Sequence, residues 1–327
     1  MFKARCTTKC PQKELKFRSD NGLLHALETR EPFAKIHPVK RVPDPSRICK
    51  SYCRSAAAKK IDPNDVRTLD ACLETINYLE SLEKEFPADH QWSLVYEYIN
   101  DRLRAIRQDI IVQNKHKDPK AGEIYEKIIK FYLRSGYRCE RLTTSTYVRV
   151  HHQRELTETL ERWFEAQHSS QETTIIYILH SIQRPDIVNI VHGQKKILDE
   201  KYETMMMLIS AYVTGNFVRF FRIVNGLEEY YKYALSSAIS EMRVLALTAL
   251  HSASQSPIAK WPLKLISKWL LLSNDGSARE MISQLLLDCN FDEGLVKFQG
   301  SKKKDQLDSN GFLWISISDV EKSQSDK

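Results

Sequence analysis

Glycine is scarce in this sequence, with 10 residues in 327. The glycine-rich motifs that hold phosphates in many α/β enzymes, G-x-x-x-x-G-K-[ST] and G-x-G-x-x-G, do not occur, and neither do H-E-x-x-H or G-x-S-x-G. An apolar run near the ~18 residues of a membrane span is also missing, as is a basic-then-apolar N-terminal signal. These absences argue against a phosphate-binding α/β enzyme. We expect a soluble intracellular protein that is not an enzyme.

The cysteine content is an odd number, 7, which is typical of reduced thiols in the cytosol or nucleus rather than of a disulfide framework. The pairs Cys6/Cys10 and Cys49/Cys53 contain enough thiols for a tetrahedral zinc site. However, three residues separate the members of each pair and the pairs lie far apart, which is not a diagnostic zinc spacing. We therefore expect no metal and no cofactor, although the sequence leaves metal binding by these cysteines open. The adjacent pair His151-His152 lacks an obvious third ligand nearby.

Positive charge is unevenly distributed. Residues 1–60 contain 15 Lys/Arg and 5 Asp/Glu, a balance of +10, whereas the whole chain has a formal net charge of +7, so the remainder is about −3 by subtraction. This segment also contains Pro11, Pro32, Pro38, Pro43 and Pro45, which predict extended chain apart from one short helix at 12–29. Such an arm is either a solvated tail or a site that attracts phosphates or acidic partners.

The longest uninterrupted helical pattern is residues 91–114. Its apolar residues recur every three or four positions and predict one stripe of a long helix that faces the core: Trp92, Val95, Tyr96, Ile99, Leu103, Ile106 and Ile110. The other faces carry Asp101, Arg102, Arg104, Arg107 and Asp109. Asp101 and Arg104 are spaced for a surface ion pair worth about 0.2–0.5 kcal/mol.

Further helices are predicted on both sides of this stretch, at 62–85, 121–134, 151–168, 173–182, 199–213, 217–224 and 228–254. Asp62-Pro63 is a typical N-cap followed by proline at the first helical position. Short links make successive helices antiparallel neighbours, so the fold class is mostly α, an α-solenoid without a strict repeat.

The stretch 214–224 contains a second informative pattern. Gly215-Asn216 predicts the end of one helix and a turn, and Phe217, Phe220, Phe221 and Val224 then share one face of the next helix. An aromatic stripe at this spacing is typical of a core face rather than of a binding platform.

The last hundred residues change character. Helices are predicted at 262–273 and 277–289, with Ser277 as N-cap. Alternating strands follow at 294–298 and 312–318, on either side of a polar loop at 299–311. This order predicts a winged helix, so the domains are a basic, largely extended arm (1–60), a helical-repeat domain (61–256), a winged-helix domain (257–320) and a disordered tail (321–327).

Basic residues of the predicted winged helix are candidates for nucleic-acid binding: Lys264, Lys268, Arg279, Lys297, Lys302, Lys303 and Lys304. A basic wing can contact phosphates without reading bases. The alternative is a solvated lysine loop that protects a strand edge from aggregation.

Several of these stretches together resemble one known family. The wording from Trp92 through Tyr96 to Asp109 closely resembles the signature helix of the Sac-three/GANP family. Cys6 to Pro11 with Glu14 and Arg18, residues 50–57, and Gly215-Asn216 to Phe221 resemble further motifs of that family, with Lys9 standing where methionine is usual. The residues that carry the family motifs are expected to be structural: Cys6, Cys10, Pro11, Trp92, Tyr96, Asp101, Arg102, Leu103, Arg104, Arg107, Gln108, Asp109, Gly215, Asn216, Arg219, Phe220 and Phe221.

The resemblance implies a PCI-like helical-repeat array followed by a winged helix. It also implies a non-enzymatic scaffold of a nuclear mRNA-export (TREX-two-like) complex that docks a PCI-domain protein, which a small acidic subunit stabilises. The basic residues of the predicted winged helix, rather than the resemblance, make RNA a candidate partner through phosphate contacts. The first alternative is a centrosome duplication or spindle factor, like short members of the family. A second is a PCI-type subunit of another large assembly, and a third is a hydrolase hidden in a helical fold. The expected location is nucleus and cytoplasm, or centrosome and spindle for the first alternative.

Overall fold

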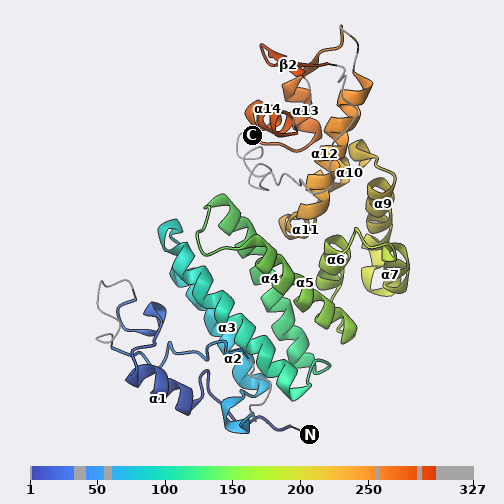
Figure 1. Cartoon of the computed structure of the whole chain (residues 1–327). Coiled ribbons are helices and arrows are strands. Elements are labelled where there is room, and N and C mark those ends of the chain that lie inside the picture. The colour runs from blue at the N-terminus through green and yellow to red at the C-terminus, as the bar shows by residue number, and fades with distance from the viewer. Residues whose placement is uncertain are drawn as a thin grey trace. The chain divides into compact units, whose positions relative to one another are not determined.

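The computed structural model describes residues 2–32, 42–54, 61–254, 256, 258–285 and 289–299. The described chain is mostly helical with one small sheet. It divides into two compact units, Met1–His168 and Ser169–Lys327 (Figure 1). The dividing point falls inside the segment 61–256 that we expected to be one helical-repeat domain, and the boundaries predicted from sequence stay predictions. Among the described residues, no helix has the length and apolar character needed to cross a membrane.

The first unit contains α1 (Gln12–Asp20), α2 (Leu69–Glu85), α3 (Trp92–Gln113), α4 (Pro119–Arg141) and α5 (Arg149–Glu165). Helices α2, α3, α4 and α5 pack against one another in overlapping pairs, and Figure 1 shows them side by side. The apolar stripe of α3 is buried as predicted, including Trp92, Ile99 and Ile106. The described part of this unit also contains short 3₁₀ turns between the helices: η1 (Ala26–Glu28), η3 (Pro63–Asp65) and η4 (Asp89–Gln91).

Two helix boundaries differ from the prediction. Asp62-Pro63 begins only the 3₁₀ turn η3, whereas α2 begins at Leu69, where the Thr68 side chain accepts a hydrogen bond from the Ala71 N–H at 3.2 Å. The helix predicted at 12–29 ends at Asp20, because Gly22 adopts a positive φ of 65° and reverses the chain. The chain after α1 therefore changes direction at Gly22 and does not extend the helix.

The second unit begins with a series of short helices: α6 (Gln171–His180), α7 (Ile187–Gly193), α8 (Lys195–Leu198), the 3₁₀ turn η5 (Asp199–Lys201), α9 (Tyr202–Val213), α10 (Phe217–Asn225), α11 (Glu229–Ala234) and α12 (Ser236–Ala253). The single helix predicted at 228–254 is two helices that meet at Leu235. Helices α7 and α8 were not predicted. Within this unit α9 packs against α7 and α10, and α10 packs against α12.

The described chain ends in β1 (Trp261–Pro262), α13 (Leu263–Trp269), α14 (Asp275–Gln284), β2 (Cys289–Asp292) and β3 (Leu295–Phe298). We call α12 and these elements the terminal module. Its three strands are antiparallel in the order β1-β3-β2. Val296 and Phe298 on β3 are buried, while Lys297 between them is half-buried.

The prediction for this region was partly wrong. Strand β3 confirms the strand expected at 294–298, but β3 pairs with β2 through a two-residue connection, Glu293-Gly294, that has positive φ at both residues. Cys289, expected to end a helix, begins β2. Asn274 rather than Ser277 caps α14, with the Ser277 N–H donating to Asn274 Oδ1 at 2.8 Å. The predicted strand 312–318 and most of the loop 299–311 lie outside the described residues.

Candidate functional site

The charged residues of α3 are largely buried, contrary to the solvent-facing positions that we predicted. Arg102, Arg107 and Asp109 are each at most 5% exposed. The predicted surface pair of Asp101 with Arg104 is also wrong. Asp101 contacts the guanidinium of neighbouring Arg102 and accepts a hydrogen bond from the Tyr52 N–H at 3.1 Å. Arg104 instead pairs with Glu155 of α5 at 3.2 Å.

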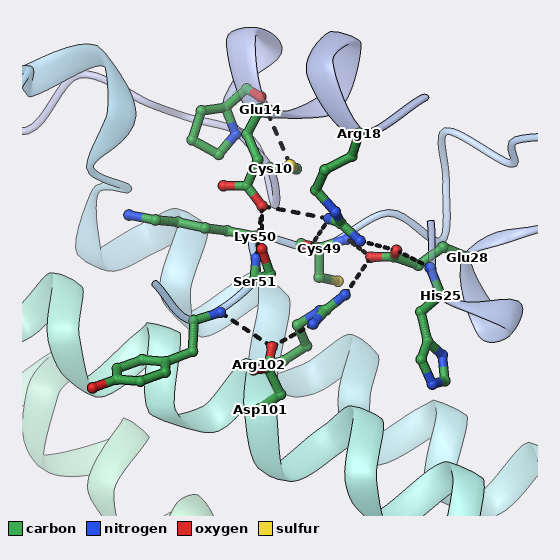
Figure 2. Close-up of polar contacts among 12 residues, drawn as sticks. Cys10, Glu14, Arg18, His25, Glu28, Cys49, Lys50, Ser51, Asp101 and Arg102 are labelled. Atoms are coloured by element: carbon green, nitrogen blue, oxygen red, sulfur yellow. Dashed lines mark hydrogen bonds and ion pairs between the residues drawn. The ribbon is translucent and has the colours of Figure 1, made fainter. Parts of the chain in front are cut away.

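Glu28 is the centre of the first part of this buried network (Figure 2). Its carboxylate is fully buried and pairs with Arg18 of α1 and with Arg102 of α3, the latter at 2.9 Å. It also accepts hydrogen bonds from the backbone N–H groups of His25 (3.0 Å) and Cys49 (3.2 Å). Burial alone would raise the pKa of Glu28, but Arg102 and Arg18 lower it below its ordinary value. Glu28 is therefore a fixed negative charge that joins three segments of the chain.

Asp109 is the centre of the second part. Its Oδ2 accepts a hydrogen bond from Arg67 Nε at 2.6 Å, and its Oδ1 lies 2.5 Å from Lys50 Nζ. Lys50 also donates to the backbone oxygen of Asp65 at 2.6 Å. Burial would lower the pKa of Arg67, but Asp109 outweighs that effect and raises it. The cation therefore remains charged although no part of its side chain reaches solvent.

Glu14 connects α1 to the same segment. Its Oε1 accepts hydrogen bonds from the N–H and the hydroxyl of Ser51 at 2.8 and 2.9 Å, and it lies 3.4 Å from Arg18 (Figure 2). Arg18 in turn donates to the carbonyl of Cys49 at 3.0 Å. Three stretches that the sequence analysis singled out separately, around Glu14, Lys50 and Asp101, thus meet in one network. We call it the arm clasp: Glu14, Arg18, Glu28, Lys50, Arg67, Asp101, Arg102 and Asp109.

The four cysteines considered for zinc have other environments. The Cys6 thiol donates to the Thr8 carbonyl at 3.3 Å, and the Cys10 thiol to the Pro11 carbonyl at 3.7 Å. Burial raises the pKa of Cys10 to about 12 and also raises that of Cys49, so both thiols stay protonated. Cys53 is exposed. In the described part of the chain, no three His, Cys, Asp or Glu side chains are grouped as metal ligands.

The remaining motif residues of α3 contact α5, the N-terminal segment or the core. Arg107 pairs with Glu155 and, at 2.8 Å, with Glu158. The Arg104 guanidinium also lies over the Tyr52 ring, 4.0 Å from its centroid. Gln108 donates to the Cys53 carbonyl at 2.8 Å. Leu103 and Tyr96 are buried in the core.

His152, one of the two adjacent histidines, is a core residue. Its ring nitrogens lie 3.1 Å from the Tyr96 hydroxyl and 2.8 Å from the Tyr132 carbonyl oxygen. Burial lowers the pKa of His152 to about 4, so the ring is neutral at physiological pH. His151 is exposed, and the pair does not act as a unit.

The second motif is mainly structural. Gly215 follows α9 with a φ of 64°, and Asn216 caps α10 by accepting a hydrogen bond from the Arg219 N–H at 3.0 Å. Phe220 and Phe221 are buried and pack edge-to-face with centroids 5.3 Å apart. The predicted turn is confirmed, and so is the core face at Phe220, Phe221 and Val224, whereas Phe217 is half-buried. The Arg219 side chain is exposed.

The candidate nucleic-acid residues do not form a single surface within the described part of the module. Lys264 and Lys268 are exposed one turn apart on α13. Arg279 of α14 stacks on the Phe291 ring at 4.7 Å, and Phe291 is directly opposite buried Val296 in the sheet. Lys297, the next residue along β3, is therefore on the opposite face of the sheet from Arg279. Lys302, Lys303 and Lys304 lie outside the described residues.

The tip of the β2–β3 hairpin is acidic. Asp292 and Glu293 are exposed there, and Asp292 pairs with Lys260 at 3.2 Å. The described hairpin tip is a different segment from the loop 299–311, for which we predicted a basic wing and of which only Gln299 is described. An acidic tip repels a phosphate backbone.

The arm clasp has the character of a structural site. Glu28 and Asp109 each face two cations and are closed to solvent, so neither is poised to exchange a proton with a substrate. Sequence reasoning missed Glu28, Arg67 and Glu155, because a single charged residue in a polar segment carries no periodic signal. For Glu28, the sequence contains one local signal: the spacing His25-x-x-Glu28, which forms a capping box at the start of η1.

The model of the SAC3/GANP family matches this chain over residues 9–290. The matched range contains the arm clasp, the turn at Gly215 and the terminal module as far as the beginning of β2. It covers well over half of the chain.

Proposed function

Since the chain belongs to the SAC3/GANP family, we propose that it is a non-enzymatic scaffold subunit related to nuclear mRNA export, in a TREX-two-like complex. The observation that carries this proposal is the extent of the family match, which includes both compact units. The arm clasp agrees with it, because the charges of the signature helix are used to hold the fold together. A scaffold needs such rigidity to present fixed surfaces to other subunits.

The terminal module is the proposed docking site for a PCI-domain partner. Its order of helix, strand, two helices and a hairpin, with sheet order β1-β3-β2, supports a winged-helix interpretation. The succession of helices in each unit supports the further proposal of a PCI-like solenoid. A small acidic subunit that stabilises the partner is also part of the proposal.

Contacts between α12 and the rest of the module support its use as a rigid unit. Arg243, fully buried on α12, donates to the carbonyls of Leu270 and Leu271 at 3.0 and 2.7 Å, directly after α13. These are carbonyls that a helix end leaves without intrahelical partners. Near the C-terminal end of α12, His251 lies 3.0 Å from the Gln299 carbonyl oxygen. A partner that binds α13 or the sheet would therefore be held firmly to α12.

The charges of the described module favour a protein over RNA as its main ligand. Lys264 and Lys268 offer a small basic site on α13, but Asp292 and Glu293 occupy the hairpin tip. RNA binding through phosphate contacts, including any by Lys302 to Lys304, stays a secondary part of the proposal.

Affinity purification of the tagged full chain from nuclear and from mitotic extracts, each with and without nuclease, tests the proposal. We expect a PCI-domain protein from nuclear extract, retained after nuclease treatment. Recovery of spindle-pole proteins from mitotic extract alone would support the centrosome alternative. Recovery of subunits of an unrelated assembly would support the second alternative, and both of these outcomes would contradict an export role. Lys264→Glu/Lys268→Glu should reduce crosslinking to RNA while leaving the nuclease-resistant partner bound.

A further inference from the structure

Helix α1 has two different faces. Its inner face carries Glu14 and Arg18, which belong to the arm clasp (Figure 2). Its outer face carries Lys13, Lys16, Phe17 and Asp20, all exposed and spaced at i, i+3, i+4 and i+7. The ion pairs on the inner face fix the orientation in which the outer face is presented.

The outer face includes two large apolar side chains in water. Phe17 is 59% exposed and Leu23 is 56% exposed. The end of α1 is a Schellman motif, in which the Gly22 N–H bonds to the Ser19 carbonyl at 3.4 Å and the Leu23 N–H to the Arg18 carbonyl at 2.9 Å. In Schellman motifs the apolar side chains at the positions of Leu23 and Phe17 are frequently neighbours. Two exposed apolar side chains at one end of α1, flanked by polar residues, are a feature typical of an interaction site.

The charges around this pair are mainly positive. In the described part of the chain, Lys13 and Lys16 have no ion-pair partner, whereas the lysines and arginines of the arm clasp are paired. Asp20, at the last helical position, is the one carboxylate on this face. A ligand that complements the face would therefore carry apolar side chains with carboxylates beside them.

We propose that the outer face of α1 docks a short acidic amphipathic helix of a partner protein, with apolar side chains on Phe17 and Leu23 and carboxylates opposite Lys13 and Lys16. A nine-residue helix is about 13 Å long, which suits a short segment better than a globular interface. Because the arm clasp orders α1 in advance, binding does not require the helix to fold. The inference extends the proposed scaffold role. It rests on that role only in taking the ligand to be a partner protein.

Fluorescence anisotropy with the full chain tests this proposal. The probe is a labelled helical peptide about four turns long, with leucine on one face and glutamate elsewhere, and the control probe has lysine in place of glutamate. We expect the wild type to bind the acidic peptide, more weakly as salt rises. Phe17→Ser/Leu23→Ser should weaken binding about tenfold or more. Lys13→Glu/Lys16→Glu should lose the acidic peptide and gain the lysine peptide.

Matched control variants distinguish binding at this face from nonspecific binding to exposed apolar side chains. Val150→Ser and Val213→Ser remove apolar side chains that are 67% and 68% exposed elsewhere, and they should bind the acidic peptide like the wild type. The thermal unfolding midpoint of each variant, followed by circular dichroism, should match the wild type because the changed side chains are exposed.

Three results would overturn the proposal. The first is no binding by the wild type, or equal binding by wild type and both double variants. The second is self-association that Phe17→Ser/Leu23→Ser abolishes, which would assign the face to a second copy of this chain. The third is binding to phosphatidylserine vesicles, but not to the peptide, that Lys13→Glu/Lys16→Glu abolishes. Failure of the wild type to bind the peptide, while it still binds a PCI partner, would count against this inference alone and leave the proposed scaffold role standing.

Discussion

The Lys50 ammonium lies 2.5 Å from the Asp109 carboxylate, although 59 positions separate the two residues in the chain. Arg67 holds the other oxygen of the same carboxylate at 2.6 Å. A basic residue of the N-terminal arm is thus bound to the middle of the fold, at a position where Asp109 is 1% exposed. At least part of the positive charge of residues 1–60 is therefore internal.

Removing this buried carboxylate should be costly. Asp109→Asn leaves Lys50 and Arg67 without a counter-charge, and we expect a loss of about 3–5 kcal/mol in the free energy of unfolding. Urea unfolding followed by circular dichroism measures the effect. Asp70→Asn is the matched control, because the Asp70–Lys120 pair is 74% and 51% exposed, and it should cost less than about 1 kcal/mol. Equal effects of the two substitutions would contradict a structural role for Asp109.

Glu28 should make stability depend on pH in the acidic range. Its pKa is lower in the folded protein than its ordinary value of 4.5, so its contribution is fully present above that value. The contribution is lost as pH falls through the lower folded pKa. Urea unfolding at a series of pH values below about pH 5 should show this loss in the wild type and a flatter dependence in Glu28→Gln. Glu28→Gln should also be destabilised at neutral pH, since Arg18 and Arg102 lose their shared partner.

His152 should contribute a separate pH dependence at a higher pH. Its pKa is lowered to about 4 in the folded state from an ordinary value of 6.5, so only the unfolded chain takes up a proton between these values. Stability should therefore fall as pH drops from 6.5 towards 4, by up to about 3 kcal/mol at 1.36 kcal/mol per pKa unit. His152→Gln should lack this component. An unchanged slope in the variant would show that other groups cause it.

Gly136 allows the close approach of His152 to α4. A Cβ added at Gly136 would lie 2.8 Å from Nε2 of the buried His152 ring. Gly136→Ala should therefore cost about 1–3 kcal/mol in the free energy of unfolding, despite the higher helix propensity of alanine. Gly193→Ala on α7 is the control, because nothing lies within 4 Å of its added Cβ, and it should be neutral or stabilising by up to about 1 kcal/mol. Thermal or urea unfolding of both variants decides the comparison.

Much of the helical framework could be predicted, and the reason is local. The apolar stripe of α3 and the turn at Gly215 depend on spacing within one segment, and both are confirmed. The sheet was predicted less well. Strand β2 and its two-residue connection to β3, Glu293-Gly294, were not predicted, because residues 277–289 were expected to be helical. A two-residue turn without Asn-Gly or Asp-Gly leaves a weak signal in sequence.

The amino-acid sequence by itself determined the mostly helical class, the core face of α3 and the family to which the chain belongs, because periodicity and motif wording are properties of neighbouring residues. Only the tertiary structure decided where the charges of α3 lie. A charged residue in a helix looks the same in sequence whether it faces water or a buried counter-charge. The partners of Arg102 and Asp109 are supplied by Glu28, Lys50 and Arg67, which come from distant positions.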